Sequence, residues 1–277
     1  VYKRQPFRFQ CGVAGAHDHA ACLAGFADRL NRFFDGEHPT RMTPYRHADV
    51  AAGVSAARTV YTGNYVLSPA ALEYFIPFAG LGLRMAGPVL GRLVQSGIGT
   101  AFVAANLPML HSRTVRESGY AEFRSGVDRS ATLVDLSGEF ERQFFGDVML
   151  FTVIELITQG YPQEIPAAGR VDAVVRAVQA RLREAYAANR SRVLGRLVAL
   201  EALLESPDGW WSVSAEFSAT RALLEQFAAS LHANFGTGAK AFRLIDDEVH
   251  GEQRRRAIVA ALLAYQSDRD HWCRLLA

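Results

Sequence analysis

The sequence predicts an α/β protein whose C-terminal region is helical. Up to about residue 130, short apolar runs alternate with Gly, Pro and Asn, as in strands and helices joined by turns. Beyond that point, apolar residues recur at the spacing of amphipathic helices. The chain has 277 residues, of which 49% are hydrophobic and 21% charged. This length allows one large domain or two modest ones.

The first five residues (1–5, VYKRQ) match the translation of an adapter that is used to prepare sequencing libraries. We therefore expect them to be non-native, with the natural sequence resuming near Pro6 and an unknown length missing before it. The alternative is a natural basic pentapeptide at the start of a processed chain. The predicted domains are 6–129, which is α/β in character, and 130–277, which is helical.

Composition and charge exclude several classes of protein. The net charge is only +2 and the basic residues are scattered, so we expect no nucleic-acid surface. No apolar run reaches the roughly 18 residues of a membrane-spanning helix. The three cysteines lack CxxC spacing, which gives no zinc site and favours a reducing compartment. We therefore expect a cytoplasmic protein without an integral membrane segment.

The front region is predicted to alternate strands and helices. Ser68 and Pro69 mark one helix start, as an N-cap followed by proline in the first turn. The β-branched and aromatic residues of 58–67 favour a strand, with a bend at Gly63-Asn64. The expected elements are strands at 7–14, 58–67 and 99–105, helices at 19–34, 70–75 and 88–97, and a polar loop at 36–56.

The rear region is predicted to contain only helices. The expected helices are 137–158, 171–204, 214–235 and 246–276, with a break or bend in the last near Gly251. In the second helix, the apolar residues at 171, 174, 175, 178 and 182 share one face, which should be buried. These helices either pack on the front region or mediate self-association into a homo-oligomer.

Three short segments carry a resemblance to a known family. They read TGNY at 62–65, LRMAGP at 83–88 and LPMLHSR at 107–113. With the Ser-Pro helix between the first two, their order resembles the acceptor-side half of a GT-A nucleotide-sugar glycosyltransferase, of family 2 or a retaining relative. The resemblance covers residues 58–115 and rests on pattern and order. It implies a partial GT-A mixed sheet in the front region.

The resemblance implies transfer of a sugar from a nucleoside-diphosphate sugar to the hydroxyl of an unknown acceptor. A divalent metal, Mn²⁺ or Mg²⁺, would act as a Lewis acid on the leaving diphosphate, and His111 is placed like a late metal ligand. Arg84 and Arg113 correspond to catalytic positions, where a guanidinium neutralises phosphate by paired hydrogen bonds. The corresponding substrate-binding residues are Gly63, Asn64, Tyr65, Met85 and Gly87.

The sequence departs from the family pattern in two ways. It has no DxD motif before Gly63, and the loop at 84–88 lacks the acidic pair that supplies the base in inverting relatives. The protein is then a retaining type, an inactive one, or one that uses another carboxylate. The carboxylates available are those of Glu73, Asp135, Glu139, Glu141 and Asp147. Without the DxD segment, we expect the chain to be inactive by itself.

Two other interpretations stay open. The chain is a non-catalytic, degenerate transferase core that serves as a scaffold, which the missing acidic pair favours. Alternatively, it is an all-helical interaction protein, and the strands predicted in 58–105 are misread. A structure without a sheet would favour the last of these.

Overall fold

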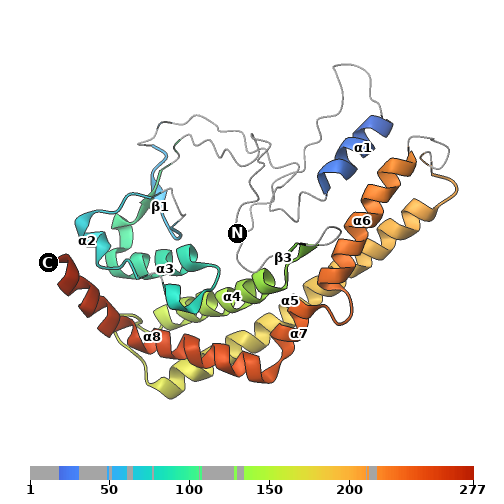
Figure 1. The fold of residues 1–277 in the computed structure, drawn as a ribbon. Helices are drawn as coiled ribbons and strands as arrows, with labels where there is room; N and C mark the ends of the chain where they lie inside the picture. The colour runs from blue at the N-terminus through green and yellow to red at the C-terminus, as the bar shows by residue number, and fades with distance from the viewer. Residues whose placement is uncertain are drawn as a thin grey trace. The chain divides into compact units, whose positions relative to one another are not determined.

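The computed structural model describes residues 19–30, 49, 52–60, 65–76, 78–105, 107, 128–129, 134–209, 211 and 217–277. Most of these residues are helical (Figure 1). The α-helices are α1 (His19–Leu30), α2 (Pro69–Leu72), α3 (Ala86–Ile98), α4 (Ser137–Ile157), α5 (Ala168–Glu205), α6 (Phe217–Phe235), α7 (Lys240–Asp246) and α8 (Glu248–Leu276). The 3-10 helices are η2 (Ala79–Leu81) and η3 (Gly99–Ala101), and the strands are β1 (Ser55–Ala56), β2 (Val103–Ala104), β3 (Asp128–Arg129) and β4 (Val134–Asp135).

The predicted GT-A mixed sheet is wrong, and the fold is mainly helical rather than α/β. Within the described ranges, strand pairing is limited to two short antiparallel pairs, β1 with β2 and β3 with β4. In the first pair, Ser55 lies opposite Ala104 and Ala56 opposite Val103. Neither pair forms a layer on which helices pack on both faces.

The strand predicted at 58–67 is extended at 58–60 but packs on helix α3. The Val60 amide donates to the carbonyl of Gly87 at 3.1 Å. A Cβ atom at Gly91 would lie 2.5 Å from the Cα atom of Thr59. Helix and extended chain therefore touch backbone to backbone. An apolar run predicts burial equally well beside a helix or in a sheet, which is why the strand prediction failed here.

The described residues form two compact units. Unit 1 contains those within Val1–His47, Pro108–Gly138 and Asn189–Lys240, and unit 2 contains those within Ala48–Leu107, Glu139–Ala188 and Ala241–Ala277. The predicted domain division at residues 129 and 130 is not tested by these units and stays a prediction.

Unit 2 has the larger apolar core, formed mainly by α4, the first part of α5 and α8. Phe144, Phe145 and Val148 of α4 are fully buried there. The stripe predicted on α5 is confirmed, because Val171, Val174, Val175, Val178 and Leu182 are all buried. Burying each such side chain contributes about 1.5–3 kcal/mol, so this face is what holds α5 in the unit.

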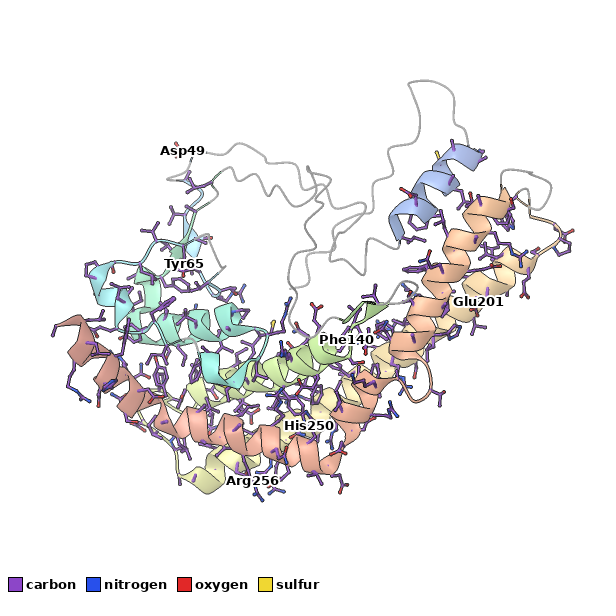
Figure 2. The ribbon with its side chains drawn as sticks, in the orientation of Figure 1. Asp49, Tyr65, Phe140, Glu201, His250 and Arg256 are labelled. Carbon is purple, nitrogen blue, oxygen red and sulfur yellow. The ribbon has the colours of Figure 1, made fainter. Side chains whose placement is uncertain are left out.

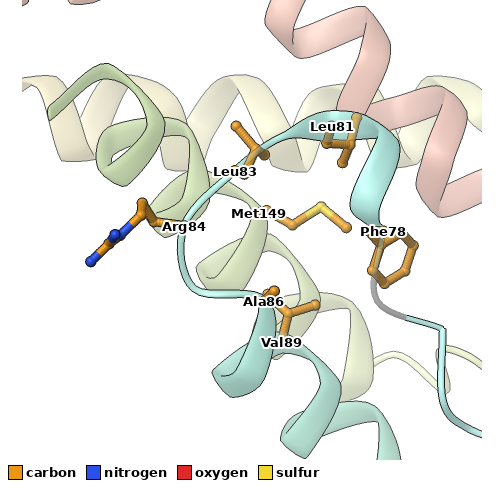
Figure 3. A pocket seen from close by; sticks show the side chains of 7 residues that line it. All are labelled: Phe78, Leu81, Leu83, Arg84, Ala86, Val89 and Met149. Atoms are coloured by element: carbon orange, nitrogen blue, oxygen red, sulfur yellow. The ribbon is translucent and has the colours of Figure 1, made fainter. Parts of the chain in front are cut away.

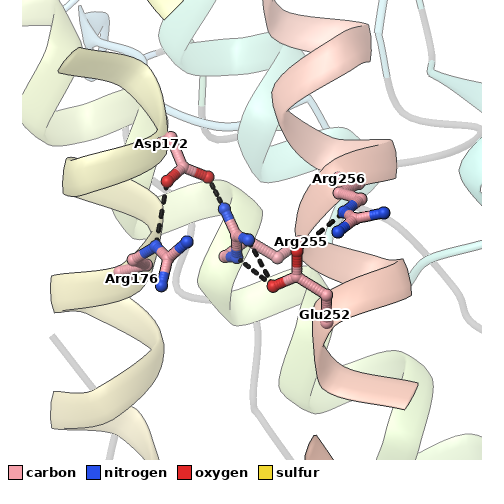
Figure 4. Close-up of polar contacts among 5 residues, drawn as sticks. All are labelled: Asp172, Arg176, Glu252, Arg255 and Arg256. Atoms are coloured by element: carbon pink, nitrogen blue, oxygen red, sulfur yellow. Dashed lines mark hydrogen bonds and ion pairs between the residues drawn. The ribbon is translucent and has the colours of Figure 1, made fainter. Parts of the chain in front are cut away.

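A line of charged side chains joins α5 to α8 beside this core (Figure 4). Arg255 of α8 is 6% exposed and pairs with Asp172 of α5 and with Glu252 of its own helix. Arg176 donates to Asp172 at 2.9 Å, and Arg256 donates to Glu252 at 2.7 Å. Each carboxylate therefore has two arginine partners. The nearly buried guanidinium of Arg255 is satisfied because it pairs with both carboxylates.

Unit 1 is built around the packing of α1 on α6. Ala27 and Leu30 of α1 are buried with Phe217 and Leu224 of α6. Asn234 of α6 fixes the chain after β4, since its side chain accepts from the Leu136 amide at 2.8 Å and donates to the Val134 carbonyl at 2.7 Å. The helix predicted at 19–34 is confirmed for the described part, 19–30.

Side chains cap the starts of α2 and α8. The Ser68 side chain accepts from the Ala71 amide at the start of α2, as predicted. Asp247 caps α8 by accepting from the His250 amide at 2.7 Å. The interruption falls at Asp247, between α7 and α8, and α8 continues through Gly251. Among the described helices, none combines the length and apolar character of a membrane span.

Candidate functional site

Four of the predicted site residues lie within the described structure and four lie outside it. Gly63, Asn64, His111 and Arg113 are outside the described residues, so their predicted roles stay predictions. Tyr65, Arg84, Met85 and Gly87 are described. The last three belong to a turn, residues 78–87, that connects the buried Ile76 region to α3. We refer to it as the 78–87 turn.

The 78–87 turn contains two side-chain-bearing residues in the left-handed backbone region. Phe78 has a φ of 50° and Met85 a φ of 68°. Bulky residues rarely adopt this conformation, which costs on the order of 1–3 kcal/mol per residue and tends to occur at functional sites. Met85 is also the N-cap of α3 and makes no side-chain capping hydrogen bond. The turn therefore combines a strained backbone with a helix N-terminus that no cap side chain satisfies.

Helices α4 and α8 hold the turn through its backbone. The Arg84 amide donates to the Arg142 carbonyl of α4 at 3.2 Å. The Arg84 carbonyl lies directly on Gly146, where a Cβ atom would collide with it. From α8, Arg254 donates to the Leu81 carbonyl at 3.1 Å. These contacts explain how strained residues persist in the turn, because the surroundings fix its path.

The Arg84 side chain pairs with a carboxylate of α4. Its Nη2 atom lies 3.4 Å from Oε1 of Glu139. The Arg84 side chain is 49% exposed and that of Glu139 only 14% exposed. This is the contact that sequence reasoning missed, although it named both residues separately. The sequence carries no signal for this contact, because 55 positions separate the two residues along the chain.

A small hollow of about 10 Å³ lies behind the turn (Figure 3). Its lining residues are Phe78, Leu81, Leu83, Arg84, Ala86, Val89 and Met149. The Arg84 side chain points away from the other six in Figure 3. Sites for drug-sized ligands usually measure about 300–1,000 Å³ and carry convergent polar groups. The hollow is therefore far too small to hold a nucleotide sugar.

Gly87 brings the 78–87 turn close to the segment that leads to Gly63 and Asn64. A Cβ atom at Gly87 would collide with the Val60 carbonyl, so this position accepts no side chain without a backbone shift. Three residues after Val60 the chain reaches Gly63. The first turn of α3, with Arg84 and Met85 just before it, thus lies beside Val60.

The residues that follow β1 and β2 leave this strand pair at opposite ends. Because β1 and β2 are antiparallel, the chain runs on to Val60 from one end of the pair and to Ala105 from the other. The described residues bring Gly87, with Arg84 and Met85 just before it, close to Val60, and they do not include His111. Tyr65, labelled in Figure 2, is 41% exposed, and its ring centre lies 6.1 Å from that of Phe75.

The five alternative carboxylates have different surroundings. Glu141 is 4% exposed and accepts two hydrogen bonds from Arg254, at 2.5 and 2.9 Å. His250, labelled in Figure 2, lies 2.9 Å from the same carboxylate. Because Arg254 also holds the Leu81 carbonyl, this buried cluster positions the 78–87 turn rather than forming an open site.

Asp147 is a partly buried carboxylate whose pKa the fold raises. Burial raises its pKa, although hydrogen bonds from Tyr186 at 2.6 Å and Gln143 at 3.0 Å act in the opposite direction. Glu73 pairs with Arg269 at 3.0 Å. In unit 1, Asp135 accepts from the Ser137 amide at 2.8 Å. Glu139 is the one of these five that pairs with a predicted site residue within the described structure, Arg84.

The described residues contain no group of three or more His, Cys, Asp or Glu side chains close enough to hold a metal ion. The predicted metal ligand, His111, is not among the residues searched. A pair of mutually bonded groups such as His250 and Glu141 is already satisfied by Arg254 and offers too few ligands.

No protein-family model, curated protein or solved structure is similar enough to this chain to count as a match. The function therefore has to be argued from the residues and their geometry.

Proposed function

We propose that this protein moves a sugar from a nucleoside-diphosphate sugar to an acceptor hydroxyl, with the 78–87 turn as part of the sugar-handling site. The observation that carries the proposal is the strained backbone of Met85. It lies between Arg84 and Gly87 at an uncapped helix start, which is the stretch that the sequence resemblance assigns to donor binding. Strain of this kind is retained where a backbone must present groups to a ligand.

The remaining roles follow the sequence resemblance. His111 completes the shell of a divalent metal, Mn²⁺ or Mg²⁺, and Arg113 or Arg84 faces the departing diphosphate. Gly63 and Asn64 contact the sugar, with Tyr65, Met85 and Gly87 beside them. We also propose a cytoplasmic location. The fold that carries the site is the mainly helical one described above, without a GT-A mixed sheet. Helices α4 and α8 support the site by fixing the turn.

The test is nucleotide binding by the purified protein. We expect UDP, GDP or dTDP to bind by isothermal titration calorimetry, and to bind more tightly with Mn²⁺ present. His111→Ala should abolish the Mn²⁺ effect. His232→Ala is the matched control, because His232 is a half-exposed histidine that pairs with Glu201 in unit 1. If none of the three nucleotides binds with or without Mn²⁺, the proposal is wrong.

A second candidate is a helical interaction protein that self-associates. The observation in its favour is the mainly helical fold with exposed apolar residues on α5, where Val198 is 60% and Leu203 53% exposed. Exposed apolar side chains on one helix are typical of protein contacts. Sedimentation equilibrium of the wild type and of a Val198→Glu, Leu203→Glu variant tests it. A monomeric wild type would rule out self-association through this helix.

A further inference from the structure

We propose that Arg58 and Arg92 together form a binding site for a phosphate group, at the surface where helix α3 packs on the 58–60 segment. The proposed function assigns the phosphate contacts to Arg84 and Arg113 and gives no role to the two arginines at α3. This inference therefore goes beyond the proposed function and does not depend on it. The phosphate group belongs either to a soluble ester or diphosphate, or to a lipid headgroup.

The first support is the backbone contact that brings the two arginines together. A Cβ atom at Gly91 would lie 2.8 Å from the Arg58 carbonyl oxygen and 2.5 Å from the Cα atom of Thr59. Arg92 directly follows Gly91 on α3. The two arginine side chains therefore start from neighbouring points of a close backbone contact.

The apolar core beneath this contact holds both elements in place. Val60, from the extended segment, is buried together with Leu90 and Val94 of α3. The Val60 amide also donates to the Gly87 carbonyl at 3.1 Å. Since Arg92 lies between two of these buried residues along the helix, its backbone position is fixed. Two cationic side chains on a rigid support are suited to binding one small anion.

The second support is that the two guanidinium groups repel each other and lack an anion to balance them. Burial, and then the charge of Arg58, lower the pKa of Arg92. Among the described residues, neither arginine side chain has an ion pair or hydrogen bond. Arg58 is exposed and Arg92 is half-buried, so an anion from solvent can reach both. A guanidinium binds phosphate oxygens by paired hydrogen bonds, and the phosphate charge would offset the repulsion.

Other half-buried arginines of unit 2 are balanced by carboxylates of the chain itself. Arg254 pairs with Glu141 at 2.5 Å, and Arg269 pairs with Glu73 at 3.0 Å. The fold therefore supplies a carboxylate where an arginine serves structure alone. The two arginines at α3 have no such carboxylate, which leaves their hydrogen-bond donors available to a ligand.

Isothermal titration calorimetry of the purified protein with pyrophosphate tests the site. We expect the wild type to bind pyrophosphate. Arg58→Gln and Arg92→Gln should each lower the affinity roughly 10-fold or more, because each removes hydrogen bonds from a charged donor. Arg92→Lys keeps the charge but loses the paired geometry, so it should retain part of the affinity. Arg181→Gln, which removes an exposed arginine of α5, is the matched control and should bind as the wild type does.

Arg58→Glu separates a binding site from two solvated arginines. The new carboxylate would pair with Arg92 and replace the repulsion by attraction, so pyrophosphate binding should be lost while Tm stays the same or rises. The unchanged or higher Tm excludes unfolding as the cause of the loss. Because Arg58 is exposed, its variants decide the question even where Arg92→Gln does not fold. An Arg58→Glu protein that binds pyrophosphate as tightly as the wild type would overturn the inference.

Vesicle sedimentation separates the two sources of phosphate. Phosphatidylcholine vesicles are compared with and without phosphatidic acid. Sedimentation that requires phosphatidic acid and both arginines identifies a lipid headgroup, whereas binding of pyrophosphate without sedimentation identifies a soluble phosphate. A wild type that binds neither pyrophosphate nor these vesicles overturns the inference, as does an equal loss of affinity in Arg181→Gln. Failure to bind UDP, GDP or dTDP overturns the proposed function alone, provided that pyrophosphate binds.

Discussion

The 78–87 turn and helix α4 lie against each other in unit 2, yet they are held in opposite ways. The turn is fixed through its backbone, by bonds to the Arg84 amide and the Leu81 carbonyl and by the contact of Gly146. Helix α4 is fixed through side chains, such as Phe144 and Phe145, that are fully buried. Removing a side chain should therefore destabilise the helix, whereas adding a side chain should destabilise the region around the turn.

The largest expected effect on stability comes from α4, which is held by buried side chains. Phe144→Ala should lower the free energy of unfolding by about 3–5 kcal/mol, because it leaves a cavity at a site with no exposure. Urea denaturation followed by circular dichroism measures this. Phe151→Ala on the same helix is the control, since Phe151 is 39% exposed and should cost far less. Equal costs would contradict the comparison.

The next largest effect on stability comes from the backbone contact between α3 and residues 58–60. Gly91→Ala should destabilise the protein by about 1–3 kcal/mol, because the new methyl group would lie 2.5 Å from the Cα atom of Thr59. Gly195→Ala should have the opposite sign and stabilise by about 0.5–1 kcal/mol, because nothing lies within 4 Å of a Cβ atom there and alanine favours helix. Thermal unfolding of both variants tests the pair. A stable Gly91→Ala protein would show that α3 does not touch the 58–60 segment.

A smaller effect should reveal the strain at Met85. Met85→Ala and Met85→Gly both remove the side chain that packs on the core of unit 2. Only glycine relieves the left-handed backbone, so the glycine variant should be more stable than the alanine variant by about 1 kcal/mol. Chemical denaturation of the two variants gives the difference directly. If alanine were the more stable of the two, Met85 would not be left-handed in solution.

The smallest expected effect concerns the pH dependence of stability. Burial raises the pKa of Asp147 above its unfolded value of 3.8. The folded protein therefore binds the proton more tightly, so the stability contributed by this group is full below pH 3.8 and is lost as pH rises through the folded pKa. Asp147→Asn should remove this loss. Urea midpoints of wild type and variant between pH 3.5 and 7 measure it, and parallel curves would contradict it.

The sequence predicted the helical part of the fold well because side-chain burial leaves a periodic pattern. The helices at 137–158 and 171–204 were found within a few residues, and the α5 stripe is buried as predicted. The mixed sheet was predicted from apolar runs at 58–67 and 99–105. Residues 58–60 instead pack on α3, where glycines let the helix take the place of a neighbouring strand, and of 99–105 only Val103 and Ala104 form a strand, paired with β1.

The candidate site was predictable only in part. Arg84, Met85 and Gly87 were identified by order and resemblance, and the structure places them in one turn with unusual backbone geometry. The partner of Arg84 was named only as one of five carboxylates. No spacing rule connects Glu139 to Arg84, because their contact depends on how α4 docks on the turn through Arg142 and Gly146.

Two glycines of α3 limit where insertions and deletions can change the structure. Gly87 and Gly91 are one helical turn apart and receive the carbonyl of Val60 and the Cα atom of Thr59. Because neither glycine has a side chain, the two positions fix where the 58–60 segment lies along the helix. A shift of this segment by one residue would move both contacts away from the glycines. Insertions and deletions between residues 60 and 87 should therefore leave the distance from Val60 to the start of α3 unchanged.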